Sequence, residues 1–485
     1  MGKDLWHLDE AMIREYQVEL VDKRLTARMA KLGKVLSLDP GASMPVLLPD
    51  ESDLEAFYKF LNNQRINWRW TWYGHKFAAS ERAAALPVVL SVSDTTGIEI
   101  PLYWDDKVRK HFTKVATRTQ GFNLHVTLAV EPGPRGRPLG VVGLQPYVHR
   151  SDVEVGSETE AYWKAEGGYY DNEMQRWFDG FLEAEQFLGR DGRKVIHVTD
   201  REGDAYSLLA GLHRENMCFV IRCVDQNRLR TVHHESLAAS QVLGEITVDL
   251  GDRFPLRPTK QVKTHPTRKA RTTTLEIRAT AIVLQKPKRT DNPWGPGGWD
   301  SLAPSIEVHL VEVVEKNPPA GEPPVHWHLL TTEPIGTPEQ VMEIVEYYRN
   351  RWLIEEWNKA LKTGCKIEQR QMDSMPAFLR MLGLLVPAAW KLLQLRLLAE
   401  DCPGAPWQVA LTPLEFHVLR AKLPKMLKSA NATVRDVHLA IAKLGGHLKR
   451  NGPPGWIVLH RGFSKLQTFV EGVELARGFV EEKPS

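Results

Sequence analysis

The spacing of hydrophobic and polar positions changes several times along the chain, and each change predicts a different kind of structure. Up to about residue 75 the apolar residues recur at helical intervals. From Pro87, short runs rich in β-branched residues predict three strands, in PVVLSVSD, GFNLHVTLAV and GVVGLQPYV. A helical stretch, NEMQRWFDGFLEAEQFL, leads to another strand, KVIHVTD, after which helix and strand alternate. A meander of strands followed by this alternation predicts a mixed α/β sheet.

The pattern changes again in the second half of the chain. After residue 222, alternating polar and apolar runs and the Pro/Gly segment NPWGPGGW indicate a β-rich insertion. Helical periodicity then returns, and Pro and Gly in DCPGAPW interrupt it near residue 401. We therefore expect a helical N-terminal domain, an α/β core in two parts around the insertion, and a helical C-terminal domain. The regions, in chain order, are 1–75, 76–222, 223–326, 327–400 and 401–485.

Length and composition limit the classes of protein that fit. A chain of 485 residues is expected to divide into two to four compact units. The formal net charge is only +3, so an argument for nucleic-acid binding must rest on local clusters. No apolar run reaches membrane-spanning length, the N-terminus is charged where a signal peptide would be apolar, and CxxC pairs are absent. These features predict a cytoplasmic protein with reduced cysteines and no membrane partner.

Residues 346–364, EYYRNRWLIEEWNKALKTG, predict a helix with one polar face. At about 100° per residue, five polar side chains return to a sector of roughly 80°. These residues are Tyr348, Arg351, Glu355, Lys359 and Lys362. The opposite face offers Leu353, Trp357 and Leu361 to a core, and Gly364 is expected to end the helix. An i,i+4 pair of Glu and Lys also solubilises ordinary helices, so the stripe alone leaves both interpretations open.

Two predicted strands end in a carboxylate, at Asp94 and at Asp200. The carboxyl ends of strands are where open α/β sheets place reactive groups, although either aspartate alone fits a turn or a helix N-cap equally well. With Glu355 they form a set of three carboxylates suited to hard divalent cations. In a two-metal site Asp94 would bridge both ions, and the other two acids would each complete one site. The cations beside Glu355 would then line the path of a phosphate backbone.

The order Asp, Asp, Glu with the spacing Y-x2-R-x3-E-x6-K resembles the bacterial cut-and-paste DDE transposases of the insertion-sequence-four family, the family of the transposon Tn-five transposase. The strings SDTT, TDRE, WHLLTTEP and RWLIEEWNKALKTG resemble blocks of that family, and DKRLTAR and AFYKFLNN resemble its end-recognition domain. The resemblance covers nearly the whole chain and is weakest in the insertion and the last 80 or so residues. It implies an RNase H-like core that holds two Mg²⁺ ions, which Mn²⁺ can replace, with a DNA-binding domain before it and a dimerisation domain after it.

The resemblance also implies an activity and partners. Members nick transposon ends, form a hairpin, hydrolyse it and transfer the strand into target DNA, and one two-metal site can serve all of these displacements at phosphorus. The implied partners are double-stranded DNA, as inverted repeats and target, and a second copy of the chain in a synaptic complex. No nucleotide cofactor is implied, in keeping with the lack of a P-loop sequence. The implied location is the bacterial cytoplasm, in association with the nucleoid.

The resemblance assigns DNA contacts to ten residues. Trp327 is expected to stack on a base flipped from the hairpin, although a Trp on a strand is more often a packing residue. The others are expected to hold the distorted backbone, the DNA near the acids or the transposon end. They are Tyr348, Arg351, Arg222, Arg201, Lys359, Lys362, Arg24, Arg28 and Lys59. Leu25 stands where a relative has Arg, so the preferred end sequence is expected to differ.

Several alternatives remain at this point. His233, His234, His326 and His328 suggest metal ligation, but surface or strand positions explain them more simply. The basic segment 260–271 fits a DNA-facing edge and a solvated hairpin equally well. The alternative function is a catalytically inactive DNA-binding regulator of transposition, which is disfavoured because all three acids are present. A glycosidase with a carboxylate pair does not explain the cations around Glu355.

Overall fold

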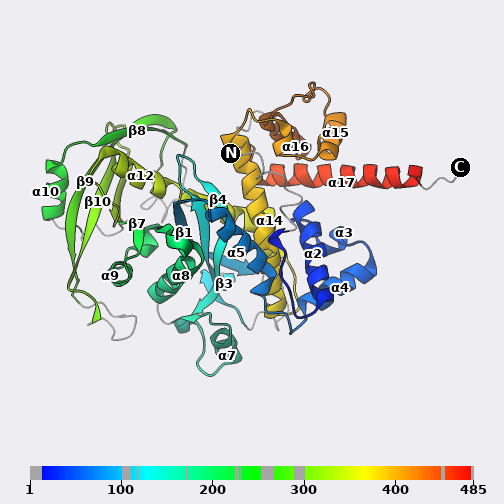
Figure 1. The fold of residues 1–485 in the computed structure, drawn as a ribbon, viewed down its shortest axis with the longest axis horizontal. Coiled ribbons are helices and arrows are strands. Elements are labelled where there is room, and N and C mark those ends of the chain that lie inside the picture. The colour runs from blue at the N-terminus through cyan, green and yellow to red at the C-terminus, as the bar shows by residue number, and fades with distance from the viewer. Residues whose placement is uncertain are drawn as a thin grey trace.

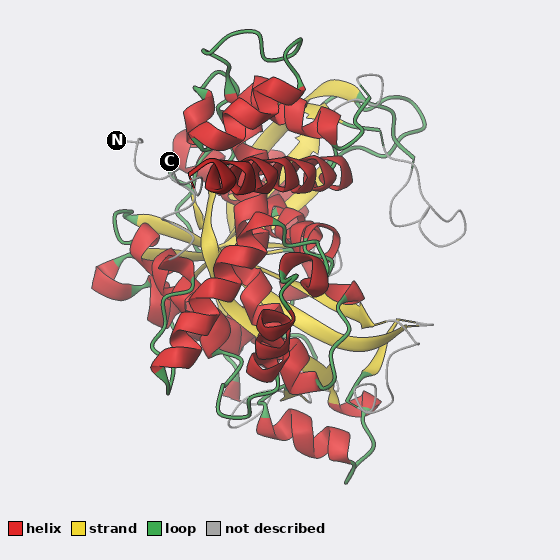
Figure 2. Ribbon diagram, turned by 90° about the vertical axis from the view of Figure 1, so that its right-hand side faces the viewer, coloured by secondary structure: helices red, strands yellow, loops and turns green. Residues whose placement is uncertain are grey.

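The chain folds around one large mixed sheet with helices on both sides (Figure 1). The structure is a computed structural model, and it describes residues 14–100, 111–116, 119–170, 173–223, 229, 231–252, 267–288, 301–448 and 454–481. Figure 2 shows helices packed on either side of the yellow strands. The expectation of a mixed α/β sheet flanked by helices is confirmed.

The strand order is β5-β4-β3-β1-β6-β7-β11-β10-β9-β8, with β2 paired to β3. β1, β6 and β7 are parallel to one another, and β4 and β5 form the other parallel pair. The remaining neighbours are antiparallel. The strands are β1 Val88–Ile100, β2 Thr113–Ala116, β3 Thr119–Glu131, β4 Arg137–His149, β5 Tyr169–Tyr170, β6 Lys194–Thr199, β7 Cys218–Arg222, β8 Gly244–Leu250, β9 Arg271–Gln285, β10 Ser305–Glu315 and β11 His326–Thr331.

The strands of the predicted insertion continue the core sheet. β10, β9 and β8 follow β11 in the sheet order, so this region extends one edge of the same sheet. The segment NPWGPGGW and most of the basic segment 260–271 lie outside the described residues. The alternation of polar and apolar positions predicts strands here, but only the pairing of β10 with β11 reveals which sheet they join.

Helices lie around the sheet. The main helices are α2 Lys23–Leu38, α3 Met44–Leu47, α4 Glu51–Leu61, α5 Trp70–Ala83, α7 Glu158–Ala165, α8 Glu173–Leu188, α9 Tyr206–Arg214, α10 Thr231–Ala239, α12 Pro338–Arg349, α13 Trp352–Lys359, α14 Met375–Asp401, α15 Pro413–Lys422, α16 Val434–Leu444 and α17 Trp456–Glu481. α14 contacts α2 and α4 as well as β4, and thus lies between the N-terminal helices and the sheet (Figure 1). α15, α16 and α17 pack together near the C-terminus.

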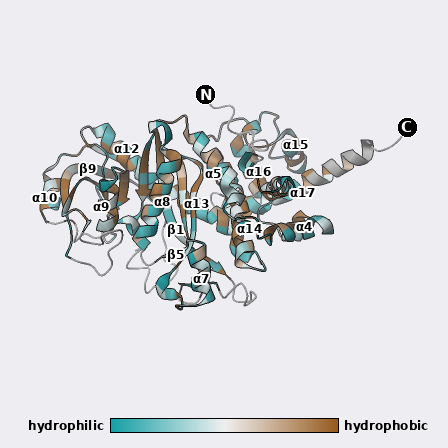
Figure 3. Cartoon of the chain, turned by 60° about the horizontal axis from the view of Figure 1, so that its bottom comes forward, coloured by the Kyte–Doolittle hydropathy of each residue, from teal (hydrophilic) through white to brown (hydrophobic). Residues whose placement is uncertain are grey.

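Alternate residues of β1 face two separate hydrophobic clusters. Leu90 and Val92 share one cluster with Trp357 of α13, and Val89 shares another with Leu188 of α8. This is the period of two expected for a strand buried on both faces. Figure 3 shows hydrophobic positions in brown along the central strands between α8 and α13. The strand that ends in the first candidate acid is therefore fixed by packing on both sides.

Helix α14 corrects the expectation that no segment is apolar enough to cross a membrane. Its residues 375–400 reach the necessary length and hydropathy, but 83% of their most apolar window is buried within the protein. Arg380, on this helix, donates from Nε to the Ile66 carbonyl at 2.7 Å and from Nη1 to the Leu61 carbonyl at 2.7 Å. α14 is thus the central core helix that attaches the N-terminal helices to the sheet.

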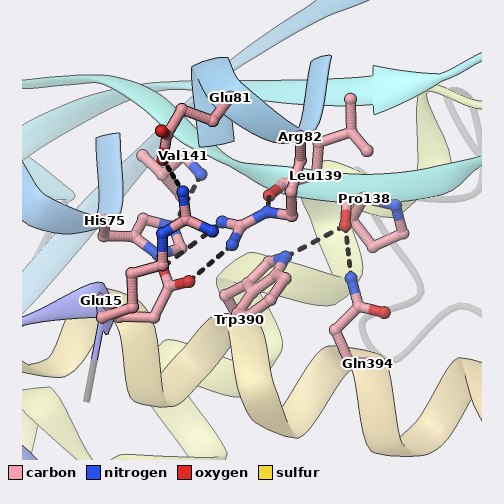
Figure 4. A network of polar contacts seen from close by, with 10 residues as sticks. Glu15, His75, Glu81, Arg82, Pro138, Leu139, Val141, Trp390 and Gln394 are labelled. Atoms are coloured by element: carbon pink, nitrogen blue, oxygen red, sulfur yellow. Dashed lines mark hydrogen bonds and ion pairs between the residues drawn. The ribbon is translucent and has the colours of Figure 1, made fainter. Parts of the chain in front are cut away.

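A buried polar network makes a second attachment of the N-terminal region (Figure 4). The Glu15 carboxylate accepts a hydrogen bond from Arg82 Nη1 at 2.5 Å and also contacts His75 Nδ1. His75 Nε2 accepts from the Val141 amide at 2.9 Å, and Arg82 Nε donates to the Leu139 carbonyl at 2.6 Å. Glu15 therefore connects the start of the described chain to α5 and, through α5, to β4.

The predicted helix over residues 346–364 is divided in the structure. α12 ends at Arg349, α13 begins at Trp352, and a π-helical turn follows at Ala360–Gly364. Asn350 Nδ2 donates to the Glu346 carbonyl at 2.7 Å and to the Gly133 carbonyl at 2.9 Å, which holds the junction against a loop of the sheet. The helical stretch ends at Gly364, as predicted, but the left-handed residue that follows it is Lys366, with φ of 52°, and not the glycine.

Candidate active site

Two aspartates lie level with each other at the ends of neighbouring parallel strands. β1 and β6 pair with Val92 opposite Val198, and the same register continued by two residues sets Asp94 opposite Asp200. Asp200 is still extended, with φ of −85° and ψ of −157°. Adjacent strands are about 4.8 Å apart, and residues at the same register share a face. The two carboxylates therefore leave the sheet side by side on the face covered by α13.

Helix α13 places Glu355 over the same end of the sheet. Trp357 and Leu353 are fully buried in the cluster that also contains Val92, as the helical pattern predicts. Asn358, on the polar side of α13, donates from Nδ2 to Asp94 Oδ2 at 3.3 Å. The side chain of Glu355 remains 45% exposed, so it is accessible from solvent.

The electrostatics of Asp94 couple the three predicted acids to one another. Burial, Asp200 and Glu355 together raise the pKa of Asp94 to about 7, while Arg351 opposes them. Repulsion between neighbouring carboxylates raises the pKa of such a group, and a bound cation would relieve this repulsion. The sequence could not show this coupling, because the three residues lie far apart along the chain.

Asp94→Asn is expected to stabilise the metal-free protein above pH 7. Because the folded-state pKa is raised, the favourable contribution of Asp94 is full below about pH 4 and is lost as the pH rises to about 7. Asparagine does not ionise, so the variant avoids this loss. The gain in the free energy of unfolding is on the order of 2 kcal/mol after allowance for solvent screening. Urea unfolding in a chelator at pH 8 and pH 4.5 measures the effect. Exposed Asp152→Asn is the control, and an equal change at both pH values for Asp94→Asn would contradict the account.

Arg351 is the cation that balances the acids. It donates to Glu355 Oε1, and its side chain is only 17% exposed. Burial works against its charge, but Tyr348, Glu355 and Asp200 hold the pKa of Arg351 above its usual range. Glu355 is thus paired with Arg351 rather than with Lys359, and the simple i,i+4 pair considered from the sequence is not the one that forms.

Glu202 is a fourth carboxylate that the sequence analysis missed. Desolvation together with Asp200, Glu173 and Asp94 raises the pKa of Glu202 to about 7. Its backbone amide donates to Asp200 Oδ1 at 2.8 Å, which fixes the turn after β6. The signal was present in the string TDRE, where Glu202 stands two residues after Asp200. Glu202 is exposed like most acids in turns, so its closeness to Asp200, Glu173 and Asp94 is what distinguishes it.

An aromatic and cationic group adjoins the acids. The rings of Trp327 and Tyr348 meet edge to face, with centroids 5.5 Å apart. Arg222 is paired in register with Leu329 and donates from Nη2 to the His326 carbonyl at 3.4 Å. Burial and the nearby Arg222 lower the pKa of Arg201, whereas Tyr348 and Asp200 favour its charge. The structure therefore brings four of the predicted DNA contacts together beside Asp200. They are Trp327, Tyr348, Arg222 and Arg201.

The two lysines of the predicted stripe have different surroundings. Lys362 Nζ donates to the Gly97 carbonyl at 2.5 Å, which joins it to β1 just beyond Asp94, and lies 3.3 Å from Glu368. Lys359 Nζ lies 2.7 Å from Glu356 Oε1, and its side chain is 55% exposed. Lys362 is thus placed near the acids, and Lys359 is turned toward a separate acidic residue.

The predicted contacts of the N-terminal domain lie on α2 and α4, apart from the acids. Arg24 is 93% exposed, although its Nε lies 3.6 Å from Asp22. Arg28 Nη1 lies 3.1 Å from Asp53 Oδ1, and Lys59 pairs with Glu55 at 2.7 Å. Helices α2 and α4 lie on the far side of α14 from the sheet (Figure 1). These residues are therefore not part of the acidic site.

The donor atoms of the acidic site suit hard cations. Its ligands are carboxylate oxygens, which Mg²⁺ and Mn²⁺ prefer. The three acids do not form a group with every ligand atom within 4.8 Å of the others, as Glu312, His326 and His328 do among the described residues. A two-ion site does not need so tight a group, because Asp200 and Glu355 would each hold a different ion about 4 Å from the other.

Comparison with known proteins identifies one segment of the chain. Residues 12–66 match the family described as Transposase DNA-binding. The chain therefore carries a transposase DNA-binding segment, and its helices α2, α3 and α4 fall within it. Among solved structures, the piggyBac transposase in a synaptic complex with hairpin DNA is similar at 10% identity over 97% of this chain and 74% of that chain, with a TM-score of 0.33. A likeness of this size does not establish a shared fold.

Proposed function

We propose that this chain is a cut-and-paste DNA transposase, with Asp94, Asp200 and Glu355 as its catalytic acids. The observation that carries the proposal is the register of β1 and β6, which sets the two aspartates level beneath the helix of Glu355. The match of residues 12–66 supplies the DNA-binding segment that such an enzyme requires. A carboxylate site on a chain with a transposase DNA-binding segment fits phosphodiester chemistry better than glycoside hydrolysis.

In this proposal the acids hold two Mg²⁺ ions, for which Mn²⁺ can substitute. When bound, the ions would activate the attacking oxygen and neutralise the leaving oxygen of an in-line displacement. Asp94, Asp200 and Glu355 are the residues that would hold the ions. Nicking, hairpin formation, hairpin hydrolysis and strand transfer then use the same set of carboxylates.

Arg351 and the group beside Asp200 would position the DNA. Arg351 is held by Glu355 and is close enough to influence Asp94, so its guanidinium can meet a phosphate next to the reacting one. Arg222 and Arg201 carry positive charge next to Tyr348 and Trp327. A bent hairpin backbone with one unstacked base needs both features, because cations hold the phosphates and an aromatic ring receives the base.

The chain would act as a homodimer on two transposon ends, in the bacterial cytoplasm and in association with the nucleoid. α17 is the element suited to dimerisation, because it extends past α15 and away from the body of the molecule (Figure 1). Its N-terminal half packs on α16, which leaves its far end for a partner.

The proposal is tested by incubating the protein with Mg²⁺ and a duplex that carries the inverted repeat flanking its gene. Denaturing gels should show a nicked strand first and a hairpin on the transposon end next. An inactive regulator of transposition would bind the duplex and leave both strands intact. Cleavage without hairpin formation would contradict the proposed sequence of steps.

Trp327→Ala is expected to slow hairpin formation by about tenfold to a hundredfold, since a base–aromatic stack contributes about 1–3 kcal/mol. First-strand nicking needs no flipped base and should change by less than about threefold. A time course of both products measures the ratio. Trp327→Phe, which keeps a ring for stacking, is the matched variant and should recover most of the rate. Equal losses of nicking and hairpin formation would remove the special role of Trp327.

A further inference from the structure

Strand β11 carries two histidines on the face opposite Trp327. His326 and His328 flank Trp327, so alternation sends their side chains to the other side of the sheet. Glu312 of β10 is paired in register with His328 and shares its face. Leu330 and Leu310, next on the same face, belong to the cluster that contains Leu237 of α10. The histidines and Glu312 therefore lie on the α10 side, away from the candidate active site.

The three side chains converge on one point. Glu312 Oε1 lies 2.8 Å from His326 Nε2 and 3.4 Å from His328 Nε2. The imidazole centroids of the two histidines are 4.4 Å apart. One ligand atom from each residue falls within 4.8 Å of the other two. Metal bonds of about 2.0 Å in a tetrahedron place neighbouring ligand atoms about 3.3 Å apart, so little movement is needed to enclose an ion.

His328 provides a second, independent observation. It is only 7% exposed, and its Nε2, which points toward Glu312, makes no hydrogen bond with good geometry. A buried ring nitrogen without a hydrogen bond costs free energy unless another partner satisfies it. An ion shared with Glu312 and His326 would satisfy it.

We propose that Glu312, His326 and His328 form a binding site for a transition-metal ion, with Zn²⁺ as the best fit. Two imidazoles and one carboxylate are a ligand set typical of zinc and poorly suited to Mg²⁺, which prefers oxygen ligands. The fourth position is open to water or to His234 of α10, whose ring centroid lies 5.7 Å from that of His328. This site is separate from the carboxylates of the candidate active site, because it lies on the opposite face of the sheet.

The neighbouring charges allow a cation at this place. Arg278 stands opposite Glu312 on β9, but its Nη1 donates to the Ser240 carbonyl at 2.8 Å and its Nη2 lies 4.0 Å from Glu276. Arg222 approaches from the other side only through its bond to the His326 carbonyl. Continuing the β7–β11 register by one residue sets Cys223 opposite His328, which adds a soft donor nearby.

The ion would fix the strand that presents Trp327. Ligands at 326 and 328 hold the backbone on both sides of Trp327, and Glu312 ties that stretch to β10. This positioning role rests on the proposed function, whereas the metal site itself does not. The test of metal binding and the test of DNA cleavage can therefore fail independently of each other.

Titration of the purified protein with Co²⁺ tests the site, because four-coordinate Co²⁺ absorbs far more strongly in the visible region than octahedral Co²⁺. The wild type should develop the strong band with one ion per chain, and Zn²⁺ should displace it. His328→Ala and Glu312→Gln should each weaken binding at least about a hundredfold. His417→Gln, a histidine on α15, should bind as the wild type does.

Two further measurements keep the test decisive. Zn²⁺ should raise the melting temperature of the wild type but not of His328→Ala, whose circular dichroism without metal confirms that it folds. Asp94→Asn should keep the strong Co²⁺ band. Loss of the band in Asp94→Asn, or a wild-type band in His328→Ala, would overturn the proposal. Unchanged hairpin formation after zinc removal would reject only the role in positioning Trp327.

Discussion

Glu355→Gln is expected to reduce cleavage of a transposon-end duplex at least about a thousandfold, because it removes one charged ligand from a two-metal site. Binding of the same duplex should change by less than about threefold, since the DNA-binding segment at residues 12–66 does not include Glu355. Gel-shift and single-turnover cleavage assays on the same preparation measure the two effects. Glutamine preserves the size of the side chain and its hydrogen bond from Arg351, so the charge is the main change.

Glu339→Gln is the matched control for this experiment. Glu339 is an exposed acid in the first turn of α12, the helix that precedes α13. Its loss should leave both cleavage and binding close to the wild type. If Glu355→Gln cut DNA at the wild-type rate, the assignment of the catalytic acids would be wrong. If the wild type itself bound the duplex and never cut it, the inactive-regulator alternative would stand.

Glu15→Ala is expected to lower the free energy of unfolding by about 3–5 kcal/mol, the usual effect of breaking a buried ion pair from one side. The Glu15 carboxylate is fully buried, and it satisfies both Arg82 and His75 (Figure 4). Burial raises the pKa of Glu15, but His75 and Arg82 outweigh it and hold the pKa below its usual range. Without the carboxylate, Arg82 remains buried without its acid. Urea unfolding followed by tryptophan fluorescence gives the change.

The surface pair of Arg14 and Glu81 provides the control for Glu15. Both acids pair with an arginine, but the Glu81 side chain is 40% exposed and that of its partner is 55% exposed. Glu81→Ala should therefore cost less than about 1 kcal/mol. Equal and small effects of the two substitutions would show that the buried network does not attach the N-terminal region to α5.

The individual elements of the site follow from local sequence, but their arrangement does not. Runs of β-branched residues predict the strands that end at Asp94 and Asp200, because such residues suit a sheet buried on both faces. The level register of the two strands depends on pairing between segments about a hundred residues apart, which no local pattern encodes. The interruption of the polar helix near Asn350 was also not predictable, because it depends on a bond to the Gly133 carbonyl of a distant loop.

Neighbours that the local sequence does not reveal explain the other differences between sequence and structure. Glu202 reads as an ordinary turn acid until its surroundings raise its pKa. α14 reads as a core helix only once its neighbours are known, since a helix that is apolar all round suits a membrane equally well. His326 and His328 suggest metal ligation in the sequence, but strand positions explain them more simply until β10 brings Glu312 opposite His328. In each case the decisive partner comes from a segment far away in the chain.

The most direct test of the central claim is Mn²⁺ anomalous scattering from crystals of the protein with a transposon-end duplex. Two peaks about 4 Å apart are expected, with Asp94 touching both and Asp200 and Glu355 each touching one. Density for manganese elsewhere, with these three carboxylates holding no ion, would contradict it.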